Sequence, residues 1–268
     1  GGGRSESLIG QFIKDRKEEL FIATKVGRNN YPGPYTADTL KLHITDSIGR
    51  LGVEALDLVQ LHCIPIKVMA SGEVFDWLRN LKKEGLIKHF GASVESMDEA
   101  LLILDQPDLT SIQIIFNIFR QKPIHTLFEK ADAKNVGIIV RLPLASGLLA
   151  GKFTGATIFD EGDHRRYNKN GAVFNVGETF AGLPFPKGVE LVDQIKPMVP
   201  EGMTMAQFAQ RWILDHEAVS TVITGATRSS QVVDNAVVSD FPLHSEETHE
   251  QVAVFYETAV REHIRGVY

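Results

Sequence analysis

The chain has 268 residues, 43% of them hydrophobic, and a formal net charge of −6 at pH 7. No polar or low-complexity linker divides it, so we expect one α/β domain over residues 1–268. An acidic chain without a basic cluster, a membrane-length apolar run or an amino-terminal signal is predicted to be soluble, with neither nucleic-acid nor membrane partners.

Helical and extended patterns alternate along the first part of the chain. Helices are marked by capping residues and apolar residues at helical spacing, and strands by short apolar runs. In chain order we first expect a helix capped by Ser5, with Leu8, Ile9, Phe12 and Ile13 on one face, and then a strand 20–25, a helix from Thr36 to Gly52 and a strand 57–62. Next come a helix with Val74, Trp77, Leu78 and Leu81 that ends at Gly85, and a strand 87–93. A helix with the capping box Ser96 and Glu99, a strand 111–117, a helix around 127–131 and a strand 137–141 complete this part.

Residues 151–185 interrupt this alternation. The segment is Gly-rich and charged, and it is long for a compact domain, which favours a binding loop or lid. The alternation then resumes with a helix over 189–195, a helix capped by Thr204 and Gln207, a strand 220–224, a helix from near Ser229 and a last helix from Ser245 to about Arg265.

The strands 20–25 and 57–62 are apolar on both faces, and helices separate the six expected strands, a pattern typical of a buried parallel sheet. No Gly-x-Gly-x-x-Gly follows any strand, which counts against a Rossmann fold. A closed barrel of this kind needs eight strands, two more than the sequence supplies.

Two titratable side chains end expected strands. Lys25 closes the strand 20–25 and His62 the strand 57–62. Barrel and doubly wound enzymes place their chemistry at the carboxyl ends of parallel strands, so both residues are candidates for catalysis. From the pattern alone, Lys25 fits a snorkelling surface residue equally well, and His62 fits a satisfied core histidine.

Cys63 is the only cysteine, so it has no second thiol for an internal disulfide or a zinc site. This favours a reducing, cytoplasmic location. A Cys63–His62 nucleophile is an alternative, but neighbours on a strand point to opposite faces. We therefore interpret Cys63 as an inert core thiol, and the histidines show no metal-binding spacing.

Five motifs occur in a fixed order. They are Gly3-x-Ser5-Glu6-x-x-Ile9-Gly10, Ala23-Thr24-Lys25, the run from Asp57 to His62, the run from Arg141 to Lys152, and Ile223 to Arg228 followed by Gln231 and Asn235. Together they resemble the aldo-keto reductases, (β/α)8 TIM barrels that reduce carbonyls with a nicotinamide cofactor, usually NADPH.

The resemblance implies a barrel whose strands 1 and 2 are missing from the chain. Of the family's catalytic Asp, Tyr, Lys and His, it places only the last two, as Lys25 and His62. The tyrosine is expected immediately before Gly1 and the aspartate earlier, in a βαβ segment of roughly 30 residues or more. Tyr31 and Tyr35, in the loop after Lys25, are a less favoured source of the acid.

The resemblance also implies an NADP(H) site. Ser93 and Gln113 are expected at the nicotinamide carboxamide, the run from Arg141 to Lys152 at the pyrophosphate, and the later motif at the adenosine 2′-phosphate. The cofactor-binding residues expected on this basis are Ser93, Gln113, Arg141, Pro143, Leu144, Ser146, Gly147, Leu148, Lys152, Gly225, Thr227, Arg228, Gln231 and Asn235. Asn117 is expected to be structural.

Two positions depart from the family pattern. Val94 follows Ser93 where the family has an asparagine, so one carboxamide contact is lost. Arg141 stands where an aromatic residue usually stacks on the nicotinamide. A guanidinium also stacks on planar rings, and a fixed cation at this place should favour the reduced cofactor.

The function implied is NADPH-dependent reduction of a small-molecule aldehyde or ketone. In this mechanism a tyrosine hydroxyl protonates the substrate oxygen, Lys25 lowers the pKa of that hydroxyl, and His62 orients the carbonyl. The alternative is a non-catalytic NADP(H)-binding subunit that acts as a redox sensor or scaffold. Neither the substrate nor the oligomeric state can be predicted.

Overall fold

The computed structural model describes residues 2–31 and 33–268, which fall into two compact units. The first unit contains the described residues of Gly1–Val94 with Asp98–Gln113 and Lys134–Val136. The second unit contains Glu95–Met97, Ile114–Ala133 and Gly137–Tyr268. None of the helices described is both long enough and apolar enough to cross a membrane.

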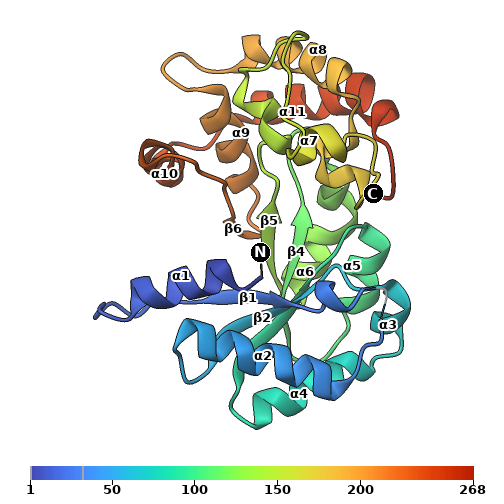
Figure 1. Ribbon diagram of the computed structural model, residues 1–268. Coiled ribbons are helices and arrows are strands. Elements are labelled where there is room, and N and C mark those ends of the chain that lie inside the picture. Colours follow the sequence, from blue (N-terminus) through green and yellow to red (C-terminus); the bar gives the residue numbers. More distant parts are fainter. Residues whose placement is uncertain (1, 32) are drawn as a thin grey trace. The chain divides into compact units, whose positions relative to one another are not determined.

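Strands and α-helices alternate from the first described strand to the fifth, with two α-helices after the second strand, and three α-helices separate the fifth strand from the sixth (Figure 1). The strands are β1 (Ala23–Val26), β2 (Leu56–His62), β3 (Ile87–Ser93), β4 (Leu109–Ile115), β5 (Gly137–Arg141) and β6 (Val219–Val222). The α-helices are α1 (Arg4–Ile13), α2 (Ala37–Leu51), α3 (Ile66–Ala70), α4 (Glu73–Lys83), α5 (Met97–Ile103), α6 (Glu129–Ala133), α7 (His164–Tyr167), α8 (Phe185–Ile195), α9 (Met205–Leu214), α10 (Ser229–Ala236) and α11 (Glu246–Phe255).

The strand pairings confirm the predicted α/β class with parallel strands. In the first unit β1 pairs with β2, β2 with β3, and β3 with β4, all in parallel. In the second unit β5 pairs in parallel with β6. Helix α2 packs on β1 and α4, and α4 packs on β3 (Figure 1). The eight-stranded closed barrel with two earlier strands stays a prediction.

Strand β1 differs from the buried strand predicted over 20–25. It begins only at Ala23, and the preceding Leu20 and Phe21 are 42% and 67% exposed. Among the described strands β1 pairs with β2 alone. Lys25 is the third of its four residues rather than its last.

Helix α1 begins and packs in a different way from the prediction. Gly3, with φ 83°, is the N-cap, so Ser5 lies inside the helix and does not cap it. The predicted apolar face is not buried, because Leu8, Ile9 and Phe12 are 54%, 40% and 56% exposed. A stripe at helical spacing therefore does not ensure a packing partner.

Polar contacts hold α1 in place instead. Thr24 Oγ1 donates to Glu6 at 2.5 Å, and Arg50 Nε donates to the same carboxylate at 2.6 Å. Burial raises the pKa of Glu6, but the bonds from Thr24 and Arg50 outweigh it and lower that pKa overall. A Cβ on Gly10 would lie 2.4 Å from the carbonyl oxygen of Arg50, so a glycine is needed where α1 meets α2.

Several helix boundaries were predictable from short-range chemistry. Thr36 caps α2, and Gly52 ends it with φ 69°. Thr204 and Gln207 form the predicted capping box of α9. The box of Ser96 and Glu99 stays a prediction.

Other predicted elements are shifted or interrupted. β4 lies two residues earlier than expected, and a π-helical turn (Ile124–Phe128) precedes α6. α8 starts at Phe185 instead of near residue 189. The last predicted helix stops at Phe255 and continues as a π-helical turn (Tyr256–Val260) and a 3-10 turn (Arg261–His263). Residues 151–185 are largely irregular, as expected.

A cluster of aromatic rings stabilises the second unit. His216 lies 4.8 Å from the ring of Trp212 and 5.0 Å from that of Phe116, both between centroids. Its Nδ1 lies 2.9 Å from the carbonyl oxygen of Trp212. Burial, with a smaller contribution from His249, lowers the pKa of His216 to about 4 from an ordinary 6.5.

We therefore expect stability to fall as the pH drops from 6.5 towards 4. In this window the unfolded chain binds a proton at His216 and the folded chain does not, so acid favours unfolding, by roughly 3 kcal/mol in total. Urea unfolding across the window should show a shallower pH slope for His216→Phe, whereas His125→Gln, at an exposed histidine, should keep the original slope. An unchanged slope in His216→Phe would contradict the assignment.

Candidate functional site

The strand register brings three predicted site residues side by side in the first unit. His62 pairs with Ser93, and Ser93 pairs with Gln113, on β2, β3 and β4. Neighbouring strands lie about 4.8 Å apart, and paired residues share a face of the sheet. Lys25 pairs with Gln60, two residues before His62, so it lies on the same face.

A buried hydrogen-bond network lies on this face. Gln113 Nε2 donates to Gln60 Oε1 at 2.8 Å, and Gln60 Nε2 donates to Ser111 Oγ at 3.4 Å. These three side chains are at most 6% exposed. A Cβ on Gly91 would lie 2.3 Å from the Ser111 carbonyl oxygen, so glycine is required between them.

Sequence reasoning missed Gln60, Ser111 and Gly91 as parts of this site. One signal was present, because Gln60 is a polar residue inside an apolar run and stands two positions before His62. On a strand that spacing places both side chains on one face. The network fixes the Gln113 amide, since its Nε2 is committed to Gln60.

Cys63 does not fit the core-thiol interpretation. β2 ends at His62, and Cys63 adopts φ 49°, so the rule that strand neighbours point to opposite faces does not apply. The residue is half-buried, and its Sγ lies 3.8 Å from Ser93 Oγ. Its chemical inertness stays a prediction.

The two loop tyrosines are poorly suited to supply the acid. Tyr31 is 65% exposed. Burial, with a further contribution from Tyr31, raises the pKa of Tyr35, which works against proton donation at neutral pH. These surroundings are consistent with the expectation that Tyr31 and Tyr35 are less favoured as the acid.

In the second unit, Arg141 faces a carboxylate. Its Nη1 lies 3.4 Å from Glu178 Oε1, and the two side chains are 11% and 15% exposed. This pair balances the charge of the guanidinium. The expectation that a fixed cation here favours the reduced cofactor therefore loses its electrostatic basis.

Ser146 fastens the turn after β5 to a later segment. Its hydroxyl donates to the Glu178 carbonyl at 3.2 Å and accepts from the Phe180 amide at 3.1 Å. Leu142, Ala145 and Ser146 have φ between 48° and 57°, a strained region for residues with side chains. Strain of this kind persists only where surrounding contacts over-determine the backbone, and it clusters at functional sites.

Other residues of the turn are buried or anchored. Pro143 and Leu148 are buried, and Leu144 and Gly147 are half-buried, whereas Lys152 is exposed. Asn117 Nδ2 donates to the Leu142 carbonyl at 2.9 Å, and Asn117 Oδ1 accepts from the Phe119 amide. These bonds match the structural role expected for Asn117.

The N-terminus of α10 offers donors suited to phosphate. Gln231 Oε1 accepts from the amides of Thr227 at 2.8 Å and Arg228 at 3.2 Å, so Gln231 caps the helix. Arg228 and Gly225 are exposed, and no atom lies within 4 Å of a Cβ placed on Gly225. The Thr227 hydroxyl also donates to Gln231 Oε1, at 3.1 Å, so the exposed Arg228 guanidinium, at a helix N-terminus next to open space, is the group that fits a phosphate.

Helix α9 supports both of these segments. A Cβ on Gly151, at the end of the turn, would lie 3.2 Å from Met205 Cβ. Gln210 Nε2 donates to Asn235 Oδ1 on α10 at 3.0 Å. Five residues of helix span about 7.5 Å, so the predicted pyrophosphate and 2′-phosphate segments lie against neighbouring parts of one helix. Sequence reasoning did not identify Met205 or Gln210.

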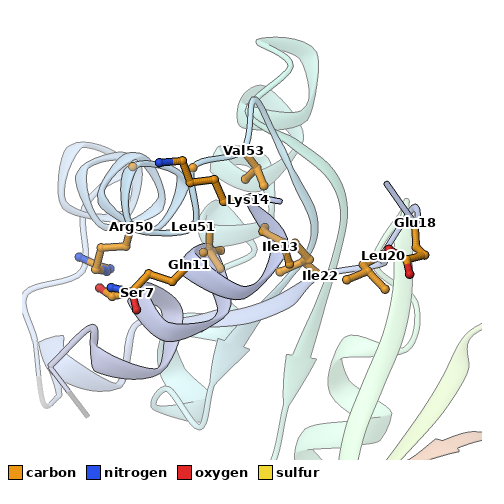
Figure 2. Close-up of a pocket in the computed structure, with 13 residues that line it drawn as sticks. Ser7, Gln11, Ile13, Lys14, Glu18, Leu20, Ile22, Arg50, Leu51 and Val53 are labelled. Carbon is orange, nitrogen blue, oxygen red and sulfur yellow. The ribbon is translucent and has the colours of Figure 1, made fainter. Parts of the chain in front are cut away.

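A hollow of about 660 Å³ in the first unit contains none of the predicted site residues. Figure 2 shows Ser7 and Gln11 of α1 around it, with Lys14 directly after α1 and Arg50 and Leu51 of α2. Its lining mixes apolar and oppositely charged groups without a convergent polar set. We therefore place the candidate site on the β2–β4 face and not in this hollow.

Comparisons with known proteins agree with the resemblance in the motifs. A family model described as "Aldo/keto reductase family" matches residues 1–254. Aldo-keto reductase str7 of Strobilurus tenacellus is 27% identical over 274 residues, which cover 98% of this chain and 76% of that protein. A probable voltage-gated potassium channel subunit beta of Arabidopsis thaliana is 27% identical over 264 residues, which cover 89% of this chain and 74% of that protein.

A solved structure shares the fold. The glycerol dehydrogenase AKR11B4 from Gluconobacter oxydans superposes with a TM-score of 0.75 at 24% identity, over 99% of this chain and 81% of that one. At this level of identity the likeness bears on the fold alone.

The packing of the β2–β4 face can be tested at two glycines. Gly91→Ala should lower the free energy of unfolding by about 1–3 kcal/mol, because the new methyl group meets the Ser111 backbone. Gly49→Ala, inside α2 with nothing within 4 Å of its Cβ, should instead raise it by about 0.5–1 kcal/mol. Urea denaturation measures both changes, and equal effects of the two substitutions would contradict the close approach at Gly91.

Proposed function

This chain belongs to the aldo/keto reductase family, and we propose that it is an oxidoreductase that reduces an aldehyde or ketone to an alcohol with NADPH. The register that sets His62, Ser93 and Gln113 side by side on β2, β3 and β4 carries the proposal. We propose that these strands belong to a (β/α)8 barrel, whose chemistry lies at the carboxyl ends of its strands.

Lys25 and His62 have separate roles in this proposal. The family mechanism assigns proton donation to a tyrosine hydroxyl, and a nearby ammonium favours the phenolate and so lowers the pKa of that hydroxyl. We assign this ammonium to Lys25. His62, at the end of β2, donates a hydrogen bond to the substrate oxygen and orients the carbonyl.

A nicotinamide cofactor, when bound, supplies the hydride. Within the first unit, Ser93 and Gln113 would hold the carboxamide of the nicotinamide. The bond from Gln113 to Gln60 fixes the orientation of the Gln113 side-chain amide. Within the second unit, the turn from Arg141 to Lys152 would hold the pyrophosphate. Arg228, Thr227 and the N-terminus of α10 would hold the 2′-phosphate, which is the basis for preferring NADPH to NADH.

Similarity to a protein named as a channel subunit favours a second candidate function. The chain is 27% identical to a protein named as a probable potassium channel subunit beta. A non-catalytic NADP(H)-binding subunit, acting as a redox sensor or scaffold, is therefore the alternative. The loss of NADPH absorbance with a panel of aldehydes and ketones separates the two, since the alternative requires cofactor binding without turnover.

The role of Lys25 predicts a split between turnover and cofactor binding. Lys25→Met should lower kcat about a hundredfold or more, in the range of general acid–base effects. The Kd for NADPH should change little, because the partner of the ammonium is the proton donor. Lys17→Met, which removes an exposed lysine, is the matched control. A parallel loss of NADPH binding in Lys25→Met would refute this role.

The role of Arg228 predicts a change in cofactor preference. A hydrogen bond to a charged group is worth about 1.5–3 kcal/mol, so Arg228→Ala should weaken NADPH binding roughly ten- to a hundredfold. NADH lacks the 2′-phosphate and should be nearly unaffected. Protein-fluorescence titrations at fixed salt measure both constants, with Arg261→Ala as the control for the loss of a cation. Equal weakening of the two cofactors would show that Arg228 supports the fold or the pyrophosphate.

A further inference from the structure

The second unit contains a pocket that the proposed function does not use. Its volume is about 480 Å³, within the range of small-molecule sites. It lies between the irregular segment that contains α7, the start of α8, and Arg265 near the end of the chain. It shares no residue with the turn at 141–152 or with the N-terminus of α10.

One wall of the pocket is apolar and rigid. The rings of Phe159 and Phe185 meet edge to face, with centroids 5.3 Å apart. Both also contact the fully buried ring of Phe180, at 5.7 and 5.0 Å. Pro184 and Pro186 continue this wall on either side of Phe185. Interlocked rings and prolines give a planar ligand a surface that is already formed.

The other wall carries positive charge. Four cationic side chains line the pocket: Arg165, Arg166, Lys169 and Arg265. None of the described residues that line it is an aspartate or a glutamate. Arg165 is paired with Asp163, and Arg166 is paired with Glu161. Because Asp163 and Glu161 are two carboxylates against four cations, the wall retains two positive charges.

Arg265 is fixed without being neutralised. Its Nε donates to Gly182 O, its Nη1 to Asn170 Oδ1, and its Nη2 to the carbonyl oxygens of Lys169 and Leu183, at 2.9–3.2 Å. All four acceptors are uncharged. These bonds use four of the five guanidinium N–H groups, which holds the cation in place and leaves its charge to act on a ligand.

Arg165 is also held in position. Its Nε lies 3.0 Å from each carboxylate oxygen of Asp163. Its Cζ lies 4.6 Å from the centroid of the Phe159 ring. The aromatic wall and the basic wall are therefore joined at this residue, so an anionic group and an apolar body can be bound together.

We propose that this pocket binds an organic dianion with a planar apolar body, of the aryl phosphate class. The phosphate matches the two unbalanced charges of Lys169 and Arg265. The Lys169 ammonium can donate hydrogen bonds to the phosphate oxygens, whereas Arg265, with one N–H group left, acts mainly through its charge. The aryl ring lies against Phe159 and Phe185. A phosphate group alone would contact only the basic wall, and an aryl ring alone would contact only the apolar wall.

The proposal can be tested with 1-naphthyl phosphate as the probe. Calorimetric titration should show 1-naphthyl phosphate binding about tenfold more tightly than either 1-naphthol or inorganic phosphate, because each of these lacks one half of the recognition. Higher salt should weaken the binding of 1-naphthyl phosphate but not that of 1-naphthol. Saturating NADPH should leave the probe bound.

The double variant Lys169→Gln, Arg166→Gln removes two exposed cations and should weaken 1-naphthyl phosphate binding about tenfold. Lys196→Gln, directly after α8 and outside the pocket lining, is the matched control. Circular dichroism checks that all variants fold. The proposal is overturned if the double variant binds as tightly as the control, if 1-naphthol binds as well as its phosphate, or if NADPH displaces the probe.

Discussion

The parallel ladder that joins β2, β3 and β4 is the constraint on which the proposed catalytic face depends. In a parallel sheet a slip of one residue moves every side chain to the opposite face. The pairs His62–Ser93 and Ser93–Gln113 therefore exist only in the observed register. Gly91 permits that register, since any side chain there would collide with Ser111, and the bond from Gln113 to Gln60 links β4 to β2 across β3.

Features set by short-range chemistry could be predicted from the sequence. β3 and β5 have the predicted bounds, and Thr36 and Gly52 delimit α2, because strand periodicity and capping depend on residues close in the chain. Features set by distant residues could not be predicted. The exposure of Phe12 depends on whether another element covers α1, and the apolar pattern that predicted the helix does not report this.

The candidate site likewise contains residues that could be predicted from the sequence and residues that could not. Lys25 and His62 could be chosen from the rule that parallel-strand enzymes use strand ends, whereas Ser93 and Gln113 came only from a resemblance. Gln60 and Gly91 act through cross-strand contacts, which no local pattern encodes. The ion pair between Arg141 and Glu178 joins residues far apart in the sequence. The expectation that Arg141 favours the reduced cofactor treated it as an isolated cation, and this pair removes the basis for that expectation.

The groups proposed for acid–base chemistry and those proposed for phosphate binding stand on different elements. Lys25 and His62 lie on β1 and β2, while the phosphate-binding groups lie on the turn after β5 and on α10, both of which pack on α9. The contacts that α9 makes with these segments involve neither Lys25 nor His62. Under the proposed assignment, dinucleotide binding persists when proton transfer is lost, so turnover distinguishes a reductase from a non-catalytic subunit where fold and cofactor affinity do not.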